Sequence, residues 1–122
     1  MTFNEHIGMT STGNPHEAKI DIEDHHKNPT GNINGGVIIS LADNLSTGCA
    51  GHHWGEKFKD QGFMVGVDLH AAMLSNQQGG TIIARSKPIR VGKRVTVIRT
   101  IVTGTDEQVL AEITTTHIPV KS

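Results

Sequence analysis

The sequence has few aromatic residues, a single cysteine and no long apolar segment. Its 122 residues include three phenylalanines, one tryptophan and no tyrosine, so the core must be built mainly from aliphatic side chains. The single cysteine, Cys49, excludes an internal disulfide bond and fits a reducing compartment. No apolar run approaches the ~20 residues that a membrane-spanning helix needs.

The chain also lacks an excess of charge. The formal net charge is −1, which gives the whole molecule no strong field for nucleic acids or membrane surfaces. The first residues contain neither the charged region nor the apolar region of a secretory signal, so we expect a cytoplasmic protein. A chain of this length predicts one domain, residues 1–122.

Glycine, in contrast, is abundant, and a turn-rich segment leads into an apolar helix. Turn-forming residues fill positions 28–36. The apolar residues that follow recur at helical spacing: Ile38, Leu41, Ala42, Leu45 and Cys49. We therefore expect a helix over residues 35–53, with Gly35 and Gly36 at its first free N–H groups. Without a Cβ, these residues let a ligand approach, and the helix dipole attracts an oxygen that gains negative charge.

Asp43 lies on the other face of this predicted helix, together with Gly36, Ser40 and Thr47. Its carboxylate is either a solvated or locally paired group, or a catalytic one. Eight residues separate it from Gly35, roughly 12 Å along a helix axis. A catalytic carboxylate must come within about 3 Å of its target. Two copies packed antiparallel about a two-fold axis would bring each Asp43 to the N-terminus of the other helix.

The rest of the chain shows the alternation of β-strands. Strands are predicted over residues 17–22, 63–73, 81–90, 95–102 and 109–118, after a short turn or helix at residues 3–8. Residues 63–73 alternate strictly, and a tight hairpin is expected at residues 91–94. The order is β-α-β-β-β-β. Because one long helix and an antiparallel sheet must bury each other, the predicted fold class is α+β.

The turn and the helix carboxylate together resemble a known family, the hotdog-fold acyl-CoA thioesterases of the phenylacetate-degradation and thioesterase superfamily member 2 type. Members typically read N-x-x-G-x-x-H-G-G, followed by L-A-D or L-V-D. This chain reads Asn28-Pro29-Thr30-Gly31-Asn32-Ile33-Asn34-Gly35-Gly36 and then Leu41-Ala42-Asp43. The resemblance spans about residues 3–117. It implies a hotdog fold, in which a curved antiparallel sheet wraps the helix and two subunits share active sites at their interface.

The resemblance also implies roles in the hydrolysis of acyl-CoA to free acid and CoA. The N–H of Gly35, beside Gly36 in the substrate-binding turn, would polarise the thioester carbonyl. Asp43 of the other subunit would act as nucleophile or as general base for water. Asn28 would orient that water or the carboxylate, and Thr47 would help to hold the acyl part or the water.

Two positions depart from the family pattern. Asn34 replaces the family histidine; asparagine can still form hydrogen bonds and cap the helix, but it cannot be protonated as imidazole can. Gly66 stands where some relatives have a serine near the carboxylate, and other members also have glycine there. Because of Asn34, a non-catalytic acyl-CoA-binding hotdog domain is an alternative interpretation.

Basic residues gather in the predicted hairpin. Arg90, Lys93 and Arg94 flank Gly92, and such a tip can bind phosphates. For Arg85 and Lys87 we expect only a solvated face.

Further CoA contacts follow from the resemblance alone: His117 on the last strand and the turn of Ser75 and Asn76. The basic hairpin could instead meet an acidic protein, so an acyl-carrier-protein thioesterase is a further alternative. The resemblance implies a homodimer as the active unit, arranged as a dimer-of-dimers tetramer. Nucleic acid is disfavoured because the basic segment is short and has no interleaved aromatics.

Eight histidines raise the question of a metal site. His25-His26 and His52-His53 are adjacent pairs, whose side chains do not readily converge on one ion. Cys49 lies on the apolar stripe, so we interpret it as a small core residue. We therefore expect no metal site, and no cofactor beyond the CoA part of the substrate.

Overall fold

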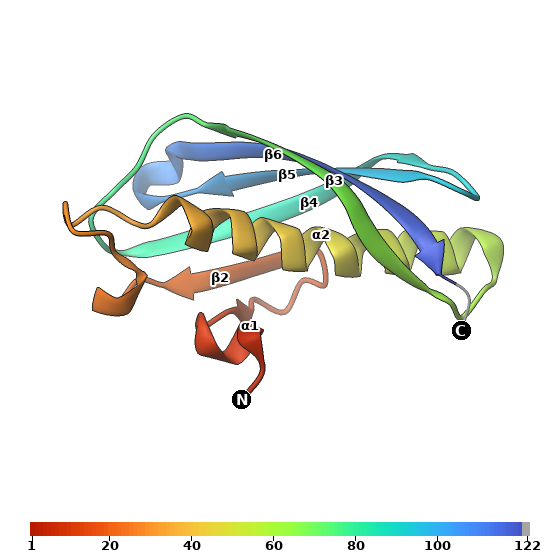
Figure 1. The fold of residues 1–122 in the computed structure, drawn as a ribbon, viewed down its shortest axis with the longest axis horizontal. Helices are drawn as coiled ribbons and strands as arrows, with labels where there is room; N and C mark the ends of the chain where they lie inside the picture. Colours follow the sequence, from red (N-terminus) through yellow and green to blue (C-terminus); the bar gives the residue numbers. More distant parts are fainter. Residues whose placement is uncertain (121–122) are drawn as a thin grey trace.

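The computed structural model, described for residues 1–120, consists of one long helix packed against a curved antiparallel sheet (Figure 1). Its helices are α1 (Phe3–His6) and α2 (Gly35–Phe58), with 3₁₀ helices at Asp24–His26 and Thr105–Glu107. Its strands are β1 (Thr10–Ser11), β2 (Glu17–Asp21), β3 (Phe63–Met73), β4 (Thr81–Val91), β5 (Thr96–Thr103) and β6 (Val109–Val120). The five longer strands lie within two residues of their predicted bounds; β1 was not predicted.

The sheet has the strand order β1-β2-β4-β5-β6-β3, and neighbouring strands are antiparallel. The long strand β3 therefore forms one edge of the sheet, and the two-residue β1 forms the other. The predicted α+β class and hotdog arrangement are confirmed. Among the described residues, no helix is both long and apolar enough to cross a membrane.

The apolar stripe predicted on α2 is the side that faces the sheet. Ile38, Leu41, Ala42 and Cys49 are fully buried, and Leu45 is nearly so. They pack against inward-facing residues of four strands: Ile20, Ile82, Ala84, Ile98, Val102 and Ile113. The core is thus aliphatic, as the composition requires.

The helix continues to Phe58 instead of ending near residue 53. Glycines at positions 51 and 55 each cost roughly 1 kcal/mol relative to alanine, but tertiary packing outweighs this cost. Trp54, only 5% exposed, belongs to a second core cluster with Cys49, Met64 and Ile98, and Phe58 packs against it. Lys59 ends the helix in a left-handed conformation at φ 52°.

A bulge interrupts β3, and the strict alternation expected for this strand is wrong. Gly66 pairs with His117 and Asp68 with Thr116, so Val67 has no partner on β6. The extra residue reverses which positions face the helix. Gly66 faces the helix before the bulge, and odd-numbered residues such as Met73 face it afterwards.

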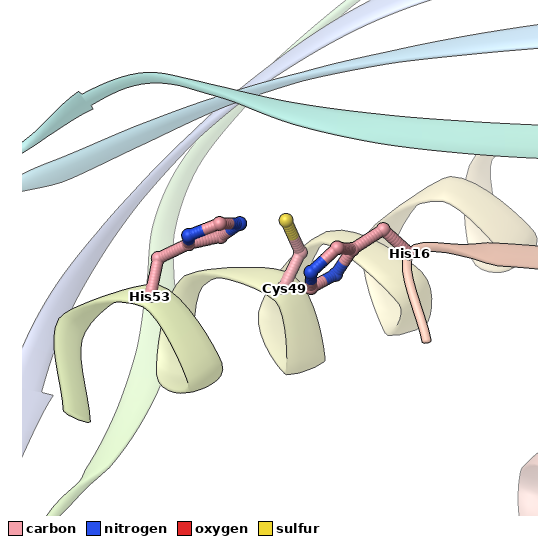
Figure 2. A group of neighbouring side chains, drawn as sticks. All are labelled: His16, Cys49 and His53. Carbon is pink, nitrogen blue, oxygen red and sulfur yellow. The ribbon is translucent and has the colours of Figure 1, made fainter. Parts of the chain in front are cut away.

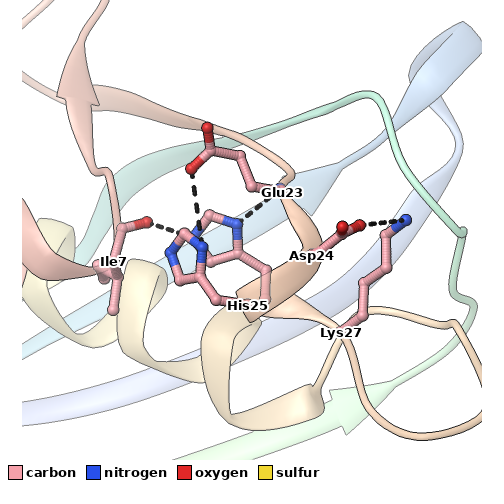
Figure 3. A network of polar contacts seen from close by, with 6 residues as sticks. Ile7, Glu23, Asp24, His25 and Lys27 are labelled. Atoms are coloured by element: carbon pink, nitrogen blue, oxygen red, sulfur yellow. Dashed lines mark hydrogen bonds and ion pairs between the residues drawn. The ribbon is translucent and has the colours of Figure 1, made fainter.

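The buried His26 fastens the segment before α2 to the N-terminal helix through Glu23 and Ile7, both labelled in Figure 3. The His26 Nδ1 accepts a hydrogen bond from the Glu23 N–H at 2.9 Å, so Nε2 carries the proton and donates to the Ile7 carbonyl at 2.7 Å. The His26 carbonyl accepts from the Asn34 N–H at 2.8 Å. These bonds fix the entrance of α2 to the rest of the fold.

Candidate active site

Asn34 caps α2. Its Oδ1 accepts a hydrogen bond from the Gly36 N–H at 2.8 Å, which confirms the capping geometry expected from the sequence. A Cβ at Gly36 would lie 3.0 Å from this oxygen, so the cap favours glycine there. The Gly35 N–H has no acceptor among the described residues. Of the two glycines, Gly35 therefore offers the free donor.

The Asp43 carboxylate is exposed and lies against the edge strand β3. A Cβ at Gly66 would lie 3.7 Å from Asp43 Oδ1 and 3.7 Å from His117 Nδ1. Gly66 thus leaves an opening in front of the carboxylate and the imidazole. The hydroxyls of Ser46 and Thr47 donate to the Asp43 carbonyl at 3.0 and 2.9 Å, so both engage the backbone instead of the carboxylate.

His117 is not at the surface, so its side chain offers no exposed atom in this arrangement, and the CoA contact expected for it stays a prediction. Its side chain is fully buried because the odd-numbered residues of β6, including Ile113 and Thr115, face the helix. Its Nε2 lies 2.7 Å from Thr115 Oγ1, whereas its buried Nδ1 has no partner in the described chain. Burial lowers the pKa of His117, and the Asp43 carboxylate acts in the opposite direction. The structure therefore places a neutral imidazole beside Asp43.

Asn28 and the turn of Ser75 and Asn76 hold the loops around the helix entrance. Asn28 Oδ1 accepts from the Thr30 N–H at 3.0 Å, which leaves its Nδ2 as the group able to contact a ligand. Asn76 Nδ2 donates to the Ile33 carbonyl at 2.9 Å, and its Oδ1 accepts from the Ile33 N–H at 3.2 Å. Ser75 Oγ accepts from Gln108 at 2.6 Å. The amide of Asn76 is thus occupied in positioning the residue before Asn34, not free for CoA.

The basic residues of the β4–β5 hairpin line two cavities. Arg90, Gly92, Lys93 and Arg94 border one of about 520 Å³, and Lys93 and Arg94 also border one of about 450 Å³. A Cβ at Gly92 would lie 2.6 Å from the Val95 carbonyl oxygen, so only glycine fits this turn without a shift. The predicted basic tip is therefore present and open to a ligand.

Two hydrogen bonds fix this hairpin to the C-terminal half of α2. Trp54 Nε1 donates to the Lys93 carbonyl at 3.0 Å, and Lys57 Nζ donates to the Val91 carbonyl at 2.6 Å. Trp54 lies eleven residues beyond Asp43, roughly 16 Å along the helix. The hairpin is therefore remote from the Asp43 of its own chain.

The predicted site residues thus form three groups along α2. The first is the capped entrance with the Gly35 N–H, and the second is Asp43 with Gly66 and His117. The third is the basic hairpin.

The sequence analysis missed Met73, whose Cε would lie 3.5 Å from a Cβ at Gly35. The bulge hid this contact, since it decides which residues of β3 face the helix.

A capped, glycine-rich helix entrance and a helix carboxylate, both held against the edge of a curved antiparallel sheet, define a hotdog-class protein. The family model described as the Thioesterase superfamily matches residues 30–111, about two-thirds of the chain. The chain belongs to this superfamily. Its assignment to the phenylacetate-degradation type stays a prediction.

Solved structures share the fold at low sequence identity. Rv1847/MT1895 of Mycobacterium tuberculosis has a TM-score of 0.90 and 19% identity, over 98% of this chain and 97% of that one. Thioesterase HI1161 of Haemophilus influenzae has a TM-score of 0.85 and 21% identity, over 97% and 82%. BH2602 of Bacillus halodurans, solved with CoA, has a TM-score of 0.81 and 19% identity, over 96% and 74%. No curated protein matches the chain.

Proposed function

We propose that the protein hydrolyses acyl-CoA thioesters to free acid and CoA. One observation carries the proposal: the free Gly35 N–H and the exposed Asp43 carboxylate both lie against the same edge strand, β3. Membership of the superfamily supports thioester hydrolysis. The CoA bound to BH2602 supports CoA as the carrier, as do the three basic residues of the hairpin.

In the proposed reaction, the Gly35 N–H and the helix dipole stabilise the carbonyl oxygen as the thioester carbon becomes tetrahedral. Asp43 takes a proton from water, whose oxygen forms the new bond to that carbon. Collapse breaks the C–S bond, and CoA leaves as a thiolate that then takes up a proton. If Asp43 instead attacks directly, a mixed anhydride forms and water hydrolyses it. The two routes differ in a single turnover in oxygen-labelled water, because the Asp43 carboxylate can acquire the label only by the nucleophilic route.

The proposed reaction needs two subunits, because Gly35 and Asp43 lie roughly 12 Å apart along one helix. The edge strand β3 supplies a surface for pairing, since Phe63 and Val67 are each 54% exposed and Met73 is 44% exposed. Unpaired edge strands with apolar side chains pair readily with another copy. We infer an antiparallel β3–β3 dimer that joins two six-stranded sheets, and a dimer of dimers as the full assembly. A cytoplasmic location fits this substrate and the unpaired cysteine.

Replacing Asp43 by asparagine tests the proposal, because it keeps the shape and removes the base or nucleophile. We expect kcat to fall by at least ~10²-fold. The matched control is Asp24→Asn, which changes an exposed carboxylate whose ion-pair partner among the described residues is Lys27, and it should keep the parent rate. Steady-state hydrolysis is measured on short, medium, long and aryl acyl-CoAs, with circular dichroism and light scattering to monitor fold and assembly.

Two results would count against this function. If Asp43→Asn folds, forms the dimer and keeps a kcat close to that of the parent, Asp43 takes no part in the chemistry. Measurable binding of acyl-CoA without turnover of any substrate by the parent protein would favour a binding domain instead.

A further inference from the structure

Three side chains that the proposed reaction does not use converge beside α2: His16, Cys49 and His53 (Figure 2). A ring nitrogen from each histidine and the cysteine Sγ all lie within 4.8 Å of one another. Cys49 and His53 are four residues apart on α2, so they lie on the same side of the helix. His16 reaches them from the segment before β2.

One ligating atom of this cluster lacks a hydrogen-bond partner among the described residues. The buried Nδ1 of His16 has no hydrogen-bond partner among the described residues. Such an atom is uncommon, because buried polar groups are nearly always hydrogen-bonded. The rings of His16 and His53 stack with centroids 4.8 Å apart. Burial, followed by the neighbouring His16 and His52, lowers the pKa of His53, which keeps its imidazole in the neutral form that binds metals.

Hydrogen bonds fix the backbone of His16, and a cavity borders the two histidines. The His16 N–H donates to Asn14 Oδ1 at 2.9 Å, and the His16 carbonyl accepts from the Ser86 N–H at 3.0 Å. A cavity of about 270 Å³, lined in part by His16 and His53, lies beside the cluster. The cavity therefore gives an ion access to the two histidines, and Cys49, which is fully buried, lies behind them.

We propose that His16, Cys49 and His53 bind a zinc ion, with water as the fourth ligand. One thiolate and two imidazoles form a donor set that Zn²⁺ favours. Zn–N and Zn–S bonds of ~2.1 and ~2.3 Å put tetrahedral donors roughly 3.3–3.6 Å apart, so the side chains close by about 1 Å on binding.

Zinc uptake displaces a proton from Cys49. Burial raises the pKa of this thiol to about 11, so the metal-free protein holds the thiol protonated at neutral pH. Each bound ion therefore releases one proton to solvent. The site is separate from Asp43, which lies six residues earlier, roughly 9 Å along the helix, so zinc binding and thioester hydrolysis are measured independently.

The test titrates the full-length, chelator-treated protein with Zn²⁺ by calorimetry and with Co²⁺ by absorbance. We expect one ion per chain, a raised Tm, and a thiolate-to-cobalt charge-transfer band with the visible bands of tetrahedral Co²⁺. Cys49→Ser should abolish the charge-transfer band. His16→Gln and His53→Gln should each weaken binding by at least ~10-fold. The matched control, His25→Gln, changes an exposed histidine outside the cluster and should bind like the parent.

His16 is the decisive position, because its ring is partly exposed and its replacement does not disturb the buried helix face. No stoichiometric binding by the folded parent protein would overturn the proposal. So would binding that lacks the charge-transfer band and survives His16→Gln, since that pattern marks adventitious surface histidines.

Discussion

The side chain at position 34 has two candidate tasks, capping α2 and contacting the substrate carbonyl. Its Oδ1 is occupied by the Gly36 N–H, so only the amide Nδ2 remains to face a ligand. The cap also orients the neighbouring Gly35 N–H. Loss of an N-cap typically costs ~0.5–2 kcal/mol of stability. We therefore expect position 34 to affect the proposed reaction through geometry even if its side chain never touches the substrate.

Asn34→Ala should lower Tm and reduce kcat by roughly tenfold, the equivalent of ~1.4 kcal/mol of transition-state stabilisation. Asn34→His should preserve or raise kcat, because it restores the residue found in the resembling family. The measurement is steady-state hydrolysis of one accepted acyl-CoA by the three proteins, with melting curves as fold controls. If Asn34→Ala turns over as fast as the parent, Asn34 is only a turn residue.

Two histidines, the buried His117 and the half-buried His53, make stability depend on pH in the same direction. The pKa values of His117 and His53 are both lowered, chiefly by burial. Above the ordinary histidine pKa of ~6.5, both folded and unfolded chains are neutral and the native state keeps its full stability. Below it, the unfolded chain takes up protons first. The free energy of unfolding should therefore fall as the pH drops below ~6.5.

Urea unfolding in the presence of a chelator, between about pH 5 and 8, measures this dependence. His117→Gln should flatten the curve, because glutamine does not titrate. The exposed His25→Gln should leave it unchanged. If the free energy of unfolding of His117→Gln depends on pH as steeply as that of the parent, His117 does not contribute to the pH dependence.

At the scale of elements, the hairpin that carries the basic residues depends on α2 for its position. Trp54→Phe keeps the buried aromatic ring and removes the Nε1 hydrogen bond to the Lys93 carbonyl. We expect a loss of ~1 kcal/mol in the free energy of unfolding. If the hairpin binds CoA phosphates, KM for acyl-CoA should rise with kcat unchanged. An acyl-pantetheine substrate, which lacks the nucleotide, should show no such rise; an equal rise would exclude this role.

Local sequence patterns were enough to predict the entrance and the buried face of α2. Turn formers, two glycines and an apolar stripe are consecutive signals, and their structural consequences are local. The end of α2 was not predictable in this way. Its glycines favour an earlier end of the helix, whereas contacts with residues far along the chain, such as those of Trp54 with Ile98 and of Lys57 with Val91, stabilise the last turns.

The face of the sheet on which each site residue lies could not be predicted from the sequence. A bulge at Val67 leaves no mark in a regular apolar–polar alternation, yet it turns Gly66 and Met73 to the same face. The burial of His117 follows from strand order, which alternation does not encode. The cluster of His16 with Cys49 and His53 had one local signal, the four-residue spacing on the helix, and its third member comes from 33 residues earlier.

At the scale of the whole molecule, the two ends of β3 constrain the dimer. Gly66 lies beside Asp43, and Met73 lies beside Gly35. Bringing the Asp43 of one copy to the Gly35 of the other requires the Gly66 end of one β3 to face the Met73 end of the second. The two-fold axis must then cross the middle of β3, between Asp68 and His70.

This register predicts which engineered cysteines cross-link. Asp68 and His70 are exposed on β3 and face away from α2. With the axis between them, Asp68 of one copy lies opposite His70 of the other, at a distance suited to a disulfide, ~4.4–6.8 Å between Cα atoms. Oxidation of a double variant that carries Asp68→Cys and His70→Cys should therefore yield a covalent dimer on non-reducing gels. Phe63→Cys, equally accessible at the end of the strand, would lie at least roughly 25 Å from its mate and should stay monomeric on the gel. The native Cys49 is fully buried and should not interfere. Cross-linking of Phe63→Cys alone, or a parent protein that is monomeric by light scattering, would rule out this dimer and with it a site shared between two subunits.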